Sequence, residues 1–430
     1  MSPLFKSIAT LPLLMLLPTS SAQTNGLTAT AGATWTPCAE ERAQCQFSGR
    51  RKVRFGAGSA GWSIRVHEDG VNCSNGIFGD PALGVEKRCE VESVTTREPL
   101  SGAPSVIEPA GQRVAPMNRS SPLPKAVGGV PTPVESAKYP IVGPIVAVQG
   151  QVIERVRVRS SSGPCIVVAV NDVTIRNAEI GPCGPGEEGK GVDVRPGATR
   201  LTMQRNYIHD MSTALYVDGG RHPIIFDRNY VTNIRGPMPR GQMVQFNGVD
   251  AGKSGSKITC NVSDTLRAAH SNVEDHINMF NSPGLAKDPT EIAYNRLRGG
   301  HPVSNSGTAI VVGDGDTGGN AWVHDNIVVH VRNVGIGVAG GVNVTVENNV
   351  VVMDKAVTYS NVGLYVWNQG KGACSGHAVR NNRVWVASSK GEQNPWWNNG
   401  NCGAVEVSGN TFGDEDLRAS IFDEVPAPCR

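Results

Sequence analysis

The segment Ile224-Ile-Phe-Asp-Arg-Asn-Tyr-Val231 carries the pattern that decides the fold: alternating apolar residues, a polar bend ending in Asn, and a second apolar pair. Six further segments repeat the pattern: Val173–Ile180, Leu201–Ile208, Trp322–Val328, Val344–Val351, Ala378–Val384 and Val405–Phe412. With Asn295, the series of Asn residues is Asn177, Asn206, Asn229, Asn295, Asn326, Asn349, Asn382 and Asn410. Most neighbours are 23 to 33 residues apart, and the gap of 66 after Asn229 fits two repeats. A period of this length indicates a solenoid.

Each Asn marks a corner of the predicted coil. Asn tolerates the left-handed backbone conformation that a one-residue bend between two strands requires. Its side-chain amide can also hydrogen-bond to the Asn of the next coil, which would build a ladder along the solenoid.

A second strand aligns in every repeat, and its inward positions are uniformly apolar. The strands are Gly191–Arg195, Ala214–Asp218, Met243–Asn247, His276–Phe280, Ala309–Gly313, Gly335–Ala339 and Gly363–Trp367. Because side chains alternate along a strand, one parity faces the core. Those positions are Val192/Val194, Leu215/Val217, Val244/Phe246, Ile277/Met279, Ile310/Val312, Ile336/Val338 and Leu364/Val366.

Together these repeats resemble the right-handed parallel β-helix of the pectate-lyase-like families. The resemblance implies an all-β, single-stranded parallel β-helix over residues 139–430, in a secreted protein that acts on carbohydrate. The sequence contains neither the Ca²⁺-binding aspartate set of pectate lyases nor the paired-Asp signature of polygalacturonases. The resemblance therefore carries over a fold but no catalytic motif.

Three regions are predicted before the solenoid. Residues 1–22 have the basic start, short apolar run and small-residue cleavage site of a signal peptide, which predicts a secreted or periplasmic protein without a membrane span. Residues 35–91 form a small cysteine-rich module, and the Pro-rich residues 92–138 form a linker. The module resembles accessory modules of secreted carbohydrate-active enzymes. Its Trp35, Phe55 and Trp62 either stack on sugars or form its core.

Ten cysteines favour disulfides in an oxidising compartment. Their spacing shows no zinc motif, so no metal site is predicted. The expected pairs are Cys38–Cys45, Cys73–Cys89, Cys165–Cys183 and Cys374–Cys402, although four cysteines in the module allow three connectivities. Cys260 and Cys429 are left over, and their connectivity stays open.

The outward positions of the second strand predict a substrate groove. One row is Asp193, Tyr216, Gln245, Asn278, Val311, Gly337 and Tyr365, and the other is Arg195, Asp218, Asn247, Phe280, Gly313, Ala339 and Trp367. Polar groups occupy the first four coils, small residues follow, and two aromatic residues end the rows. We expect Asp193, Arg195, Tyr216, Gln245, Asn247, Asn278, Tyr365 and Trp367 to bind substrate.

The catalytic candidates surround the fourth strand: Asp218, Arg240, Glu274, Asp275 and His276. Two carboxylates that flank a sugar bond can act as general acid and as base or nucleophile. Alternatively, Arg240 or Arg195 could remove a proton from a uronic acid, with His276 or Tyr216 as the acid, as the resemblance to β-helix lyases implies.

Two loops leave alternatives open. Gly313-Asp-Gly-Asp-Thr-Gly-Gly319 lacks the Lys of a phosphate loop and the closing Glu of an EF-hand, so a tight turn is favoured over a Ca²⁺ site. No cofactor is predicted, since no motif supports Ca²⁺. Asn394–Gly400 either extends the sugar platform or covers the last coils.

The sequence thus predicts a polysaccharide lyase or hydrolase, and the competing interpretation is a non-catalytic glycan-binding or envelope protein on the same scaffold. The expected partner is a polysaccharide or oligosaccharide, bound by a monomer. A net charge of +2 over 430 residues argues against nucleic acid.

Overall fold

The structure is a computed structural model that describes residues 35–92 and 130–430, apart from 49, 59–60, 79–84, 131, 266–271, 301–306, 354–359 and 388–390. The predicted signal peptide and most of the predicted linker lie outside the described residues. The chain divides into two compact units, Met1–Gln112 and Arg113–Arg430. Among the described residues, no helix has the length and apolar character needed to cross a membrane.

The first unit is an antiparallel sheet joined by two disulfides. Its sheet has the strand order β1 (Trp35–Glu40), β6 (Arg88–Glu92), β3 (Arg50–Ala57) and β4 (Gly61–Glu68). A two-stranded antiparallel sheet of β2 (Gln44–Cys45) and β5 (Val71–Asn72) and the short helix α1 (Asn75–Phe78) complete it. Cys38–Cys45 and Cys73–Cys89 are bonded as predicted. Such crosslinks compensate for the small core.

The three aromatic residues of the module have different roles. Phe55 is fully buried and stacks on Phe78, so it belongs to the core. Trp35 and Trp62 both lie against the guanidinium group of Arg54, at 4.8 and 4.2 Å from the ring centres. Both tryptophans are half-buried, and Arg54 also donates a hydrogen bond to Glu90. The rings therefore lie against a partly buried ion pair.

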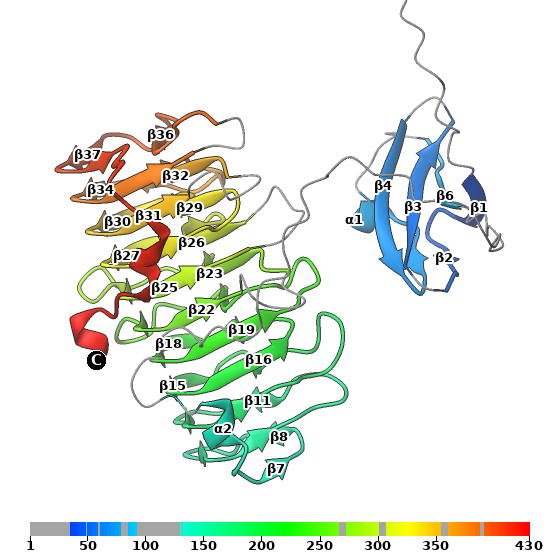
Figure 1. The fold of residues 1–430 in the computed structure, drawn as a ribbon, viewed down its shortest axis with the longest axis horizontal. Helices are drawn as coiled ribbons and strands as arrows, with labels where there is room; N and C mark the ends of the chain where they lie inside the picture. The colour runs from blue at the N-terminus through cyan, green and yellow to red at the C-terminus, as the bar shows by residue number, and fades with distance from the viewer. Residues whose placement is uncertain are drawn as a thin grey trace, which may run out of the picture. The chain divides into compact units, whose positions relative to one another are not determined.

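The second unit is a parallel β-helix, which confirms the predicted fold class (Figure 1). Each coil contributes one strand to each of three parallel sheets. Sheet I contains β8 (Ile145–Val146), β11 (Ile166–Val168), β14 (Val192–Val194), β17 (Leu215–Asp218), β20 (Val244–Asn247), β23 (Asp275–Phe280), β26 (Thr308–Asp314), β29 (Val334–Val338), β32 (Val362–Val366) and β36 (Trp396–Asn398).

The other two sheets follow sheet I along each coil. Sheet II contains β9 (Val152–Glu154), β12 (Thr174–Arg176), β15 (Thr199–Gln204), β18 (Arg221–Asp227), β21 (Lys257–Thr259), β24 (Thr290–Ala293), β27 (Gly319–His324), β30 (Gly341–Glu347), β33 (Cys374–Ser375), β34 (His377–Arg380) and β37 (Val405–Ser408). Sheet III contains β7 (Ile141–Val142), β10 (Arg157–Val158), β13 (Glu179–Ile180), β16 (Tyr207–Met211), β19 (Tyr230–Ile234), β22 (Val262–Asp264), β25 (Arg296–Arg298), β28 (Ile327–Val329), β31 (Val350–Met353), β35 (Arg383–Val386) and β38 (Thr411–Phe412).

Sheet I has the predicted inward face. All fourteen apolar residues predicted to point inward belong to one buried core cluster. The first outward row pairs in the predicted register from Asp193 to Tyr365. The second row contains an error, because a bulge after Asn278 pairs Phe280 with Asp314 rather than with Gly313. This one-residue shift brings a carboxylate onto the outward face of the fifth predicted coil.

The predicted Asn ladder exists, with two corrections. Eight Asn side chains bond in series: Asn206, Asn229, Asn261, Asn295, Asn326, Asn349, Asn382 and Asn410. Asn261 fills the gap of 66 residues, whereas Asn177 precedes the ladder position, which Ala178 occupies. The left-handed residue is the one before each ladder Asn, as at Arg205 and Arg228. One residue thus forms the bend, and the Asn that follows it forms the ladder. The side-chain Nδ2 of a ladder Asn also donates to a strand carbonyl of the previous coil, as Asn229 does to Met203.

Both ends of the second unit are fastened to the coils. Helix α2 (Pro133–Ser136) and the buried Val130 lie within the range predicted as linker, so the end of that range is packed rather than extended. The C-terminal 3₁₀ turns η1 (Ala419–Asp423) and η2 (Ala427–Cys429) lie along sheet III (Figure 1). There Cys260–Cys429 forms the pair that the sequence left open. Cys165–Cys183 and Cys374–Cys402 are bonded as predicted.

Candidate functional site

A pocket of about 270 Å³ lies on the outward face of sheet I, over the coils of β23, β26, β29, β32 and β36. Its described lining residues are Asp275, Asn278, Gly307, Thr308, Val311, Asp314, Asn333, Val334, Asn361, Val362, Tyr365, Trp367, Gln369 and Trp397. The lining thus combines two carboxylates, several amides and three aromatic rings. None of these described residues is a cation.

The two carboxylates are held by one amide. Nδ2 of Asn278 donates to Asp275 Oδ2 at 2.9 Å and to Asp314 Oδ2 at 3.2 Å. Both oxygens contact the same nitrogen, so they lie within the sum of these distances, about 6 Å, of each other. Gln245 in turn donates to Oδ1 of Asn278 at 3.2 Å, which orients the amide toward both acids. Stacked coils supply this arrangement, because Gln245 and Asn278 are register partners on adjacent strands.

Burial keeps both acids protonated to a higher pH than usual. Desolvation raises the pKa of Asp275 from 3.8 to about 6, against the opposing effect of hydrogen bonds from Asn278 and Thr308. Desolvation likewise raises the pKa of Asp314, while Asn278 and the backbone N–H of Gly315 favour its charged form. The charge of Asp314 further raises the pKa of Asp275. A pair of neighbouring acids with raised pKa values in a pocket is typical of acid–base catalysis.

Asp314 was missed as a site residue, because the sequence places it in the Gly-rich segment Gly313–Gly319. That segment does form a turn, as favoured above, between β26 and β27. The bulge extends β26 by one residue, so that its last side chain, Asp314, faces the pocket. In the second outward row Asp314 follows Phe280 by one coil, and the regular repeat placed Gly313 at that position, so the sequence carried no signal for the bulge.

The aromatic side of the pocket is built from Trp367 and Trp397. These rings are 39% and 41% exposed and meet edge to face at 5.5 Å between centres. Trp397 belongs to β36, which continues sheet I by pairing with β32. Its neighbour Trp396 packs on the core and stacks on Phe412. The Asn394–Gly400 segment therefore does both things considered above: it covers the last coil and extends the groove.

Tyr365 is a floor residue rather than an exposed platform, because it is only 6% exposed. Its ring lies across Gly337, where an added Cβ would approach the ring to 2.5 Å. Its hydroxyl accepts a hydrogen bond from Gln369 at 2.8 Å. Glycine at 337 is thus required by the close approach of the ring from the next coil.

The remaining predicted binding residues form a separate polar cluster over β14, β17 and β20. Asp193 is fully buried and forms ion pairs with Arg195 at 2.7 Å and Lys190 at 3.7 Å. The ring of Tyr216 lies beneath the cations of Arg240 and Lys190. Asn247 donates to Tyr216 and to Asp218.

This cluster does not include the Asp275–Asp314 pair. In the outward row, Asp218 pairs with Asn247, Asn247 with Phe280, and Phe280 with Asp314. Three coil spacings of about 4.8 Å place Asp218 roughly 14 Å from Asp314 along the sheet. Asp218 and Arg240, which were predicted to act with Asp275, thus belong to this cluster, and neither is among the described residues of the pocket.

His276 does not face the groove, so its prediction as a catalytic acid is wrong. The side chain is 1% exposed, and Ser263 lies 2.9 Å from Nδ1 while the carbonyl of Gly299 lies 2.8 Å from Nε2. The carbonyl can only accept, so Nε2 carries the proton and Nδ1 accepts from the serine hydroxyl. Burial lowers the pKa of His276 to about 4 and keeps it neutral. Glu274 is half-buried at the entry to β23 and is not among the described residues of the pocket.

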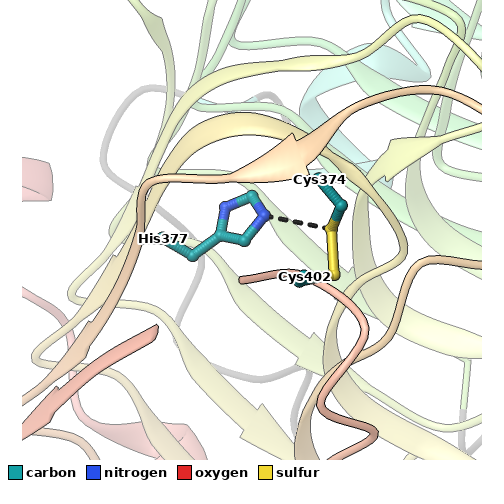
Figure 2. Close-up of side chains that lie close together, drawn as sticks. All are labelled: Cys374, His377 and Cys402. Atoms are coloured by element: carbon teal, nitrogen blue, oxygen red, sulfur yellow. Dashed lines mark hydrogen bonds between the residues drawn. A yellow bond between two sulfur atoms is a disulfide. The ribbon is translucent and has the colours of Figure 1, made fainter. Parts of the chain in front are cut away.

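The described residues contain one group with metal-ligating atoms close together, formed by Cys374, His377 and Cys402 (Figure 2). The two sulfur atoms are bonded to each other, so they are not thiolate ligands. Nδ1 of His377 accepts from the backbone N–H of Val344, which leaves the proton on Nε2, 3.3 Å from Sγ of Cys374. The group therefore fastens the last coils through a disulfide and a neutral histidine.

No family model matches the chain. Among solved structures, it is similar to the catalytic domain of GH87 alpha-1,3-glucanase in complex with nigerose, with 11% identity, a TM-score of 0.32, and coverage of 89% of this chain and 92% of that chain. A second similar structure is DFA-IIIase from Arthrobacter chlorophenolicus A6 in complex with GF2, with 12% identity, a TM-score of 0.32, and coverage of 59% and 68%. Similarity at this level does not transfer an activity.

Proposed function

We propose that this chain is a secreted glycoside hydrolase that cleaves a polysaccharide in the groove of sheet I. The observation that carries the proposal is the pair Asp275 and Asp314, held by one amide with raised pKa values. The exposed rings of Trp367 and Trp397 provide an apolar surface for the face of a pyranose beside this pair.

In the proposed reaction, protonated Asp275 donates its proton to the glycosidic oxygen as the bond from that oxygen to the anomeric carbon breaks. Asp314, in its charged form, either takes a proton from the water that attacks this carbon or attacks it directly, after which water hydrolyses the ester. Asp275 is the acid because its pKa of about 6 keeps much of it protonated near that pH. Asn278 acts as a positioning residue for both groups.

Hydrolysis is favoured over β-elimination by the charges of the pocket. Elimination needs a base near the uronic acid and a cation that neutralises its carboxylate. Arg240 and Arg195 belong to the other cluster, and the described lining of the pocket contains two carboxylates without a cation. Two acidic groups repel a uronate, so we propose a neutral glycan as substrate.

The test is an incubation with a panel of neutral and acidic polysaccharides, followed for reducing ends and for the ultraviolet absorbance of unsaturated uronates. We expect reducing ends from a neutral polysaccharide without unsaturated products. Asp314→Asn should abolish the activity, whereas Asp250→Asn, whose carboxylate is exposed away from the pocket, is the matched control. Unsaturated products would instead support a lyase, and retained binding without either product would support a non-catalytic glycan-binding protein.

A further inference from the structure

A second pocket, of about 320 Å³, lies on the outward face of sheet II, over β27, β30 and β34. Its described lining is Ala286, Pro289, Asn320, Ala321, Trp322, Asn343, Thr345, Glu347 and Arg380. None of these residues lines the groove of sheet I. From this pocket we infer that the chain has a second saccharide site, which binds a neutral pyranose of a glycan and takes no part in its cleavage.

Trp322 forms a rigid platform in this pocket. One face of its indole stacks on His324, with ring centres 3.8 Å apart and an angle of 25° between the planes. Its Nε1–H donates to Glu347 Oε1 at 2.7 Å, which holds the ring in its plane. The side chain is nonetheless 38% exposed, so it keeps an open surface for a ligand. A ring that is already fixed loses little conformational freedom when a sugar stacks on it.

Polar groups with both donor and acceptor capacity surround the ring. Arg380 reaches Glu347 and Glu406 only at 3.5 and 3.7 Å, and its Nε, although buried, has no hydrogen-bond acceptor. Asn343 donates to Asn320 at 3.1 Å, which orients both amides at the edge of the pocket. Ring hydroxyls can both donate and accept, so they match a guanidinium, a carboxylate and amides together.

The charge balance selects a neutral ligand. Glu347 and Arg380 are the charged residues of the described lining, and their charges cancel. An anionic chain would be repelled by Glu347 and by the neighbouring Glu406, whereas a neutral pyranose presents an apolar face to Trp322 without that penalty. A pocket of this volume lies at the lower end of the range for small-ligand sites, which suits one or two sugar units.

The test follows the indole N–H signal of Trp322 by NMR in the full chain. Trp322→Ala identifies the signal, and an Asp314→Asn background prevents turnover during the titration. The probes are maltopentaose, laminaripentaose and cellopentaose as neutral chains and pentagalacturonate as the anionic one. We expect at least one neutral probe to shift the Trp322 signal saturably, with roughly tenfold weaker binding at this site in Arg380→Ala.

The matched control is Trp367→Ala, which removes a ring of nearly equal exposure from the groove of sheet I. The shift of the Trp322 signal should persist in this variant, because the two rings line different pockets. The inference is overturned if no neutral probe moves the signal, if pentagalacturonate alone does, or if the shift disappears in Trp367→Ala. These outcomes are independent of whether the groove hydrolyses a glycan.

Discussion

Replacing Asp275 by Asn should stabilise the protein while it destroys activity. Asp275 is 8% exposed, and burial raises its pKa from 3.8 to about 6. The folded state therefore binds this proton more tightly than the unfolded state does. As the pH rises through this window, the unfolded state loses its proton first, and the stability of the wild-type protein falls.

The size of the effect follows from the shift. Each pKa unit corresponds to about 1.4 kcal/mol, so the charged carboxylate lowers stability by up to about 3 kcal/mol above the upper pKa. Asn is always neutral and its side-chain oxygen can still accept the hydrogen bond from Asn278. We therefore expect the variant and the wild type to have similar melting temperatures at about pH 3, and the variant to melt higher at about pH 8.

The assay is thermal unfolding of both proteins across this pH range, together with turnover measurements. Turnover of the variant should fall by about 10²- to 10⁴-fold, the usual contribution of a general acid, and wild-type turnover should decline above roughly pH 6. Asp250→Asn, at an exposed carboxylate, should give no pH-dependent gain. A melting-temperature difference that is the same at all pH values would refute the assigned burial of Asp275, and undiminished turnover would refute its role.

Three further predictions test the architecture. Gly337→Ala should displace the ring of Tyr365 and weaken substrate binding. Calorimetric titration should show this loss of affinity in the wild-type background but not in a Tyr365→Ala background, where the ring is absent. Asn261→Ala should lower the free energy of unfolding by about 1–3 kcal/mol, because it removes the acceptor of the buried N–H of Asn229 and the hydrogen bond to the carbonyl of Phe226. Asn410→Ala, at the less buried end of the ladder, should have a smaller effect in the same denaturation assay. Finally, a double Cys260→Ser, Cys429→Ser variant loses a crosslink across 169 residues, whose loop entropy contributes up to about 5 kcal/mol. Limited proteolysis should then remove the C-terminal segment first, and an uncut segment would contradict its dependence on this disulfide.

Sequence alone determined the solenoid because its signals are local and repeated. The sequence of a single strand such as Val244–Asn247 does not show which side chains face the core. Apolar residues at the same alternate positions of every coil do show it. The repeated Asn residues likewise predicted a ladder. Its one gap of two repeats is filled by Asn261, which hydrogen-bonds to Asn229 and Asn295 on the adjacent coils. The four expected disulfides are present, although for the four cysteines of the module the sequence left three connectivities open.

Tertiary structure decided the site, because the site depends on departures from that repeat. A bulge moves Asp314 into the outward row, and a strand formed by a loop brings Trp397 to the groove. His276 has the parity of a groove residue, yet hydrogen bonds to Ser263 and Gly299 hold it inside the coil. Such positions result from contacts between neighbouring coils and between sheets. Periodicity describes what the coils share, whereas the candidate chemistry lies in the residues that differ between them.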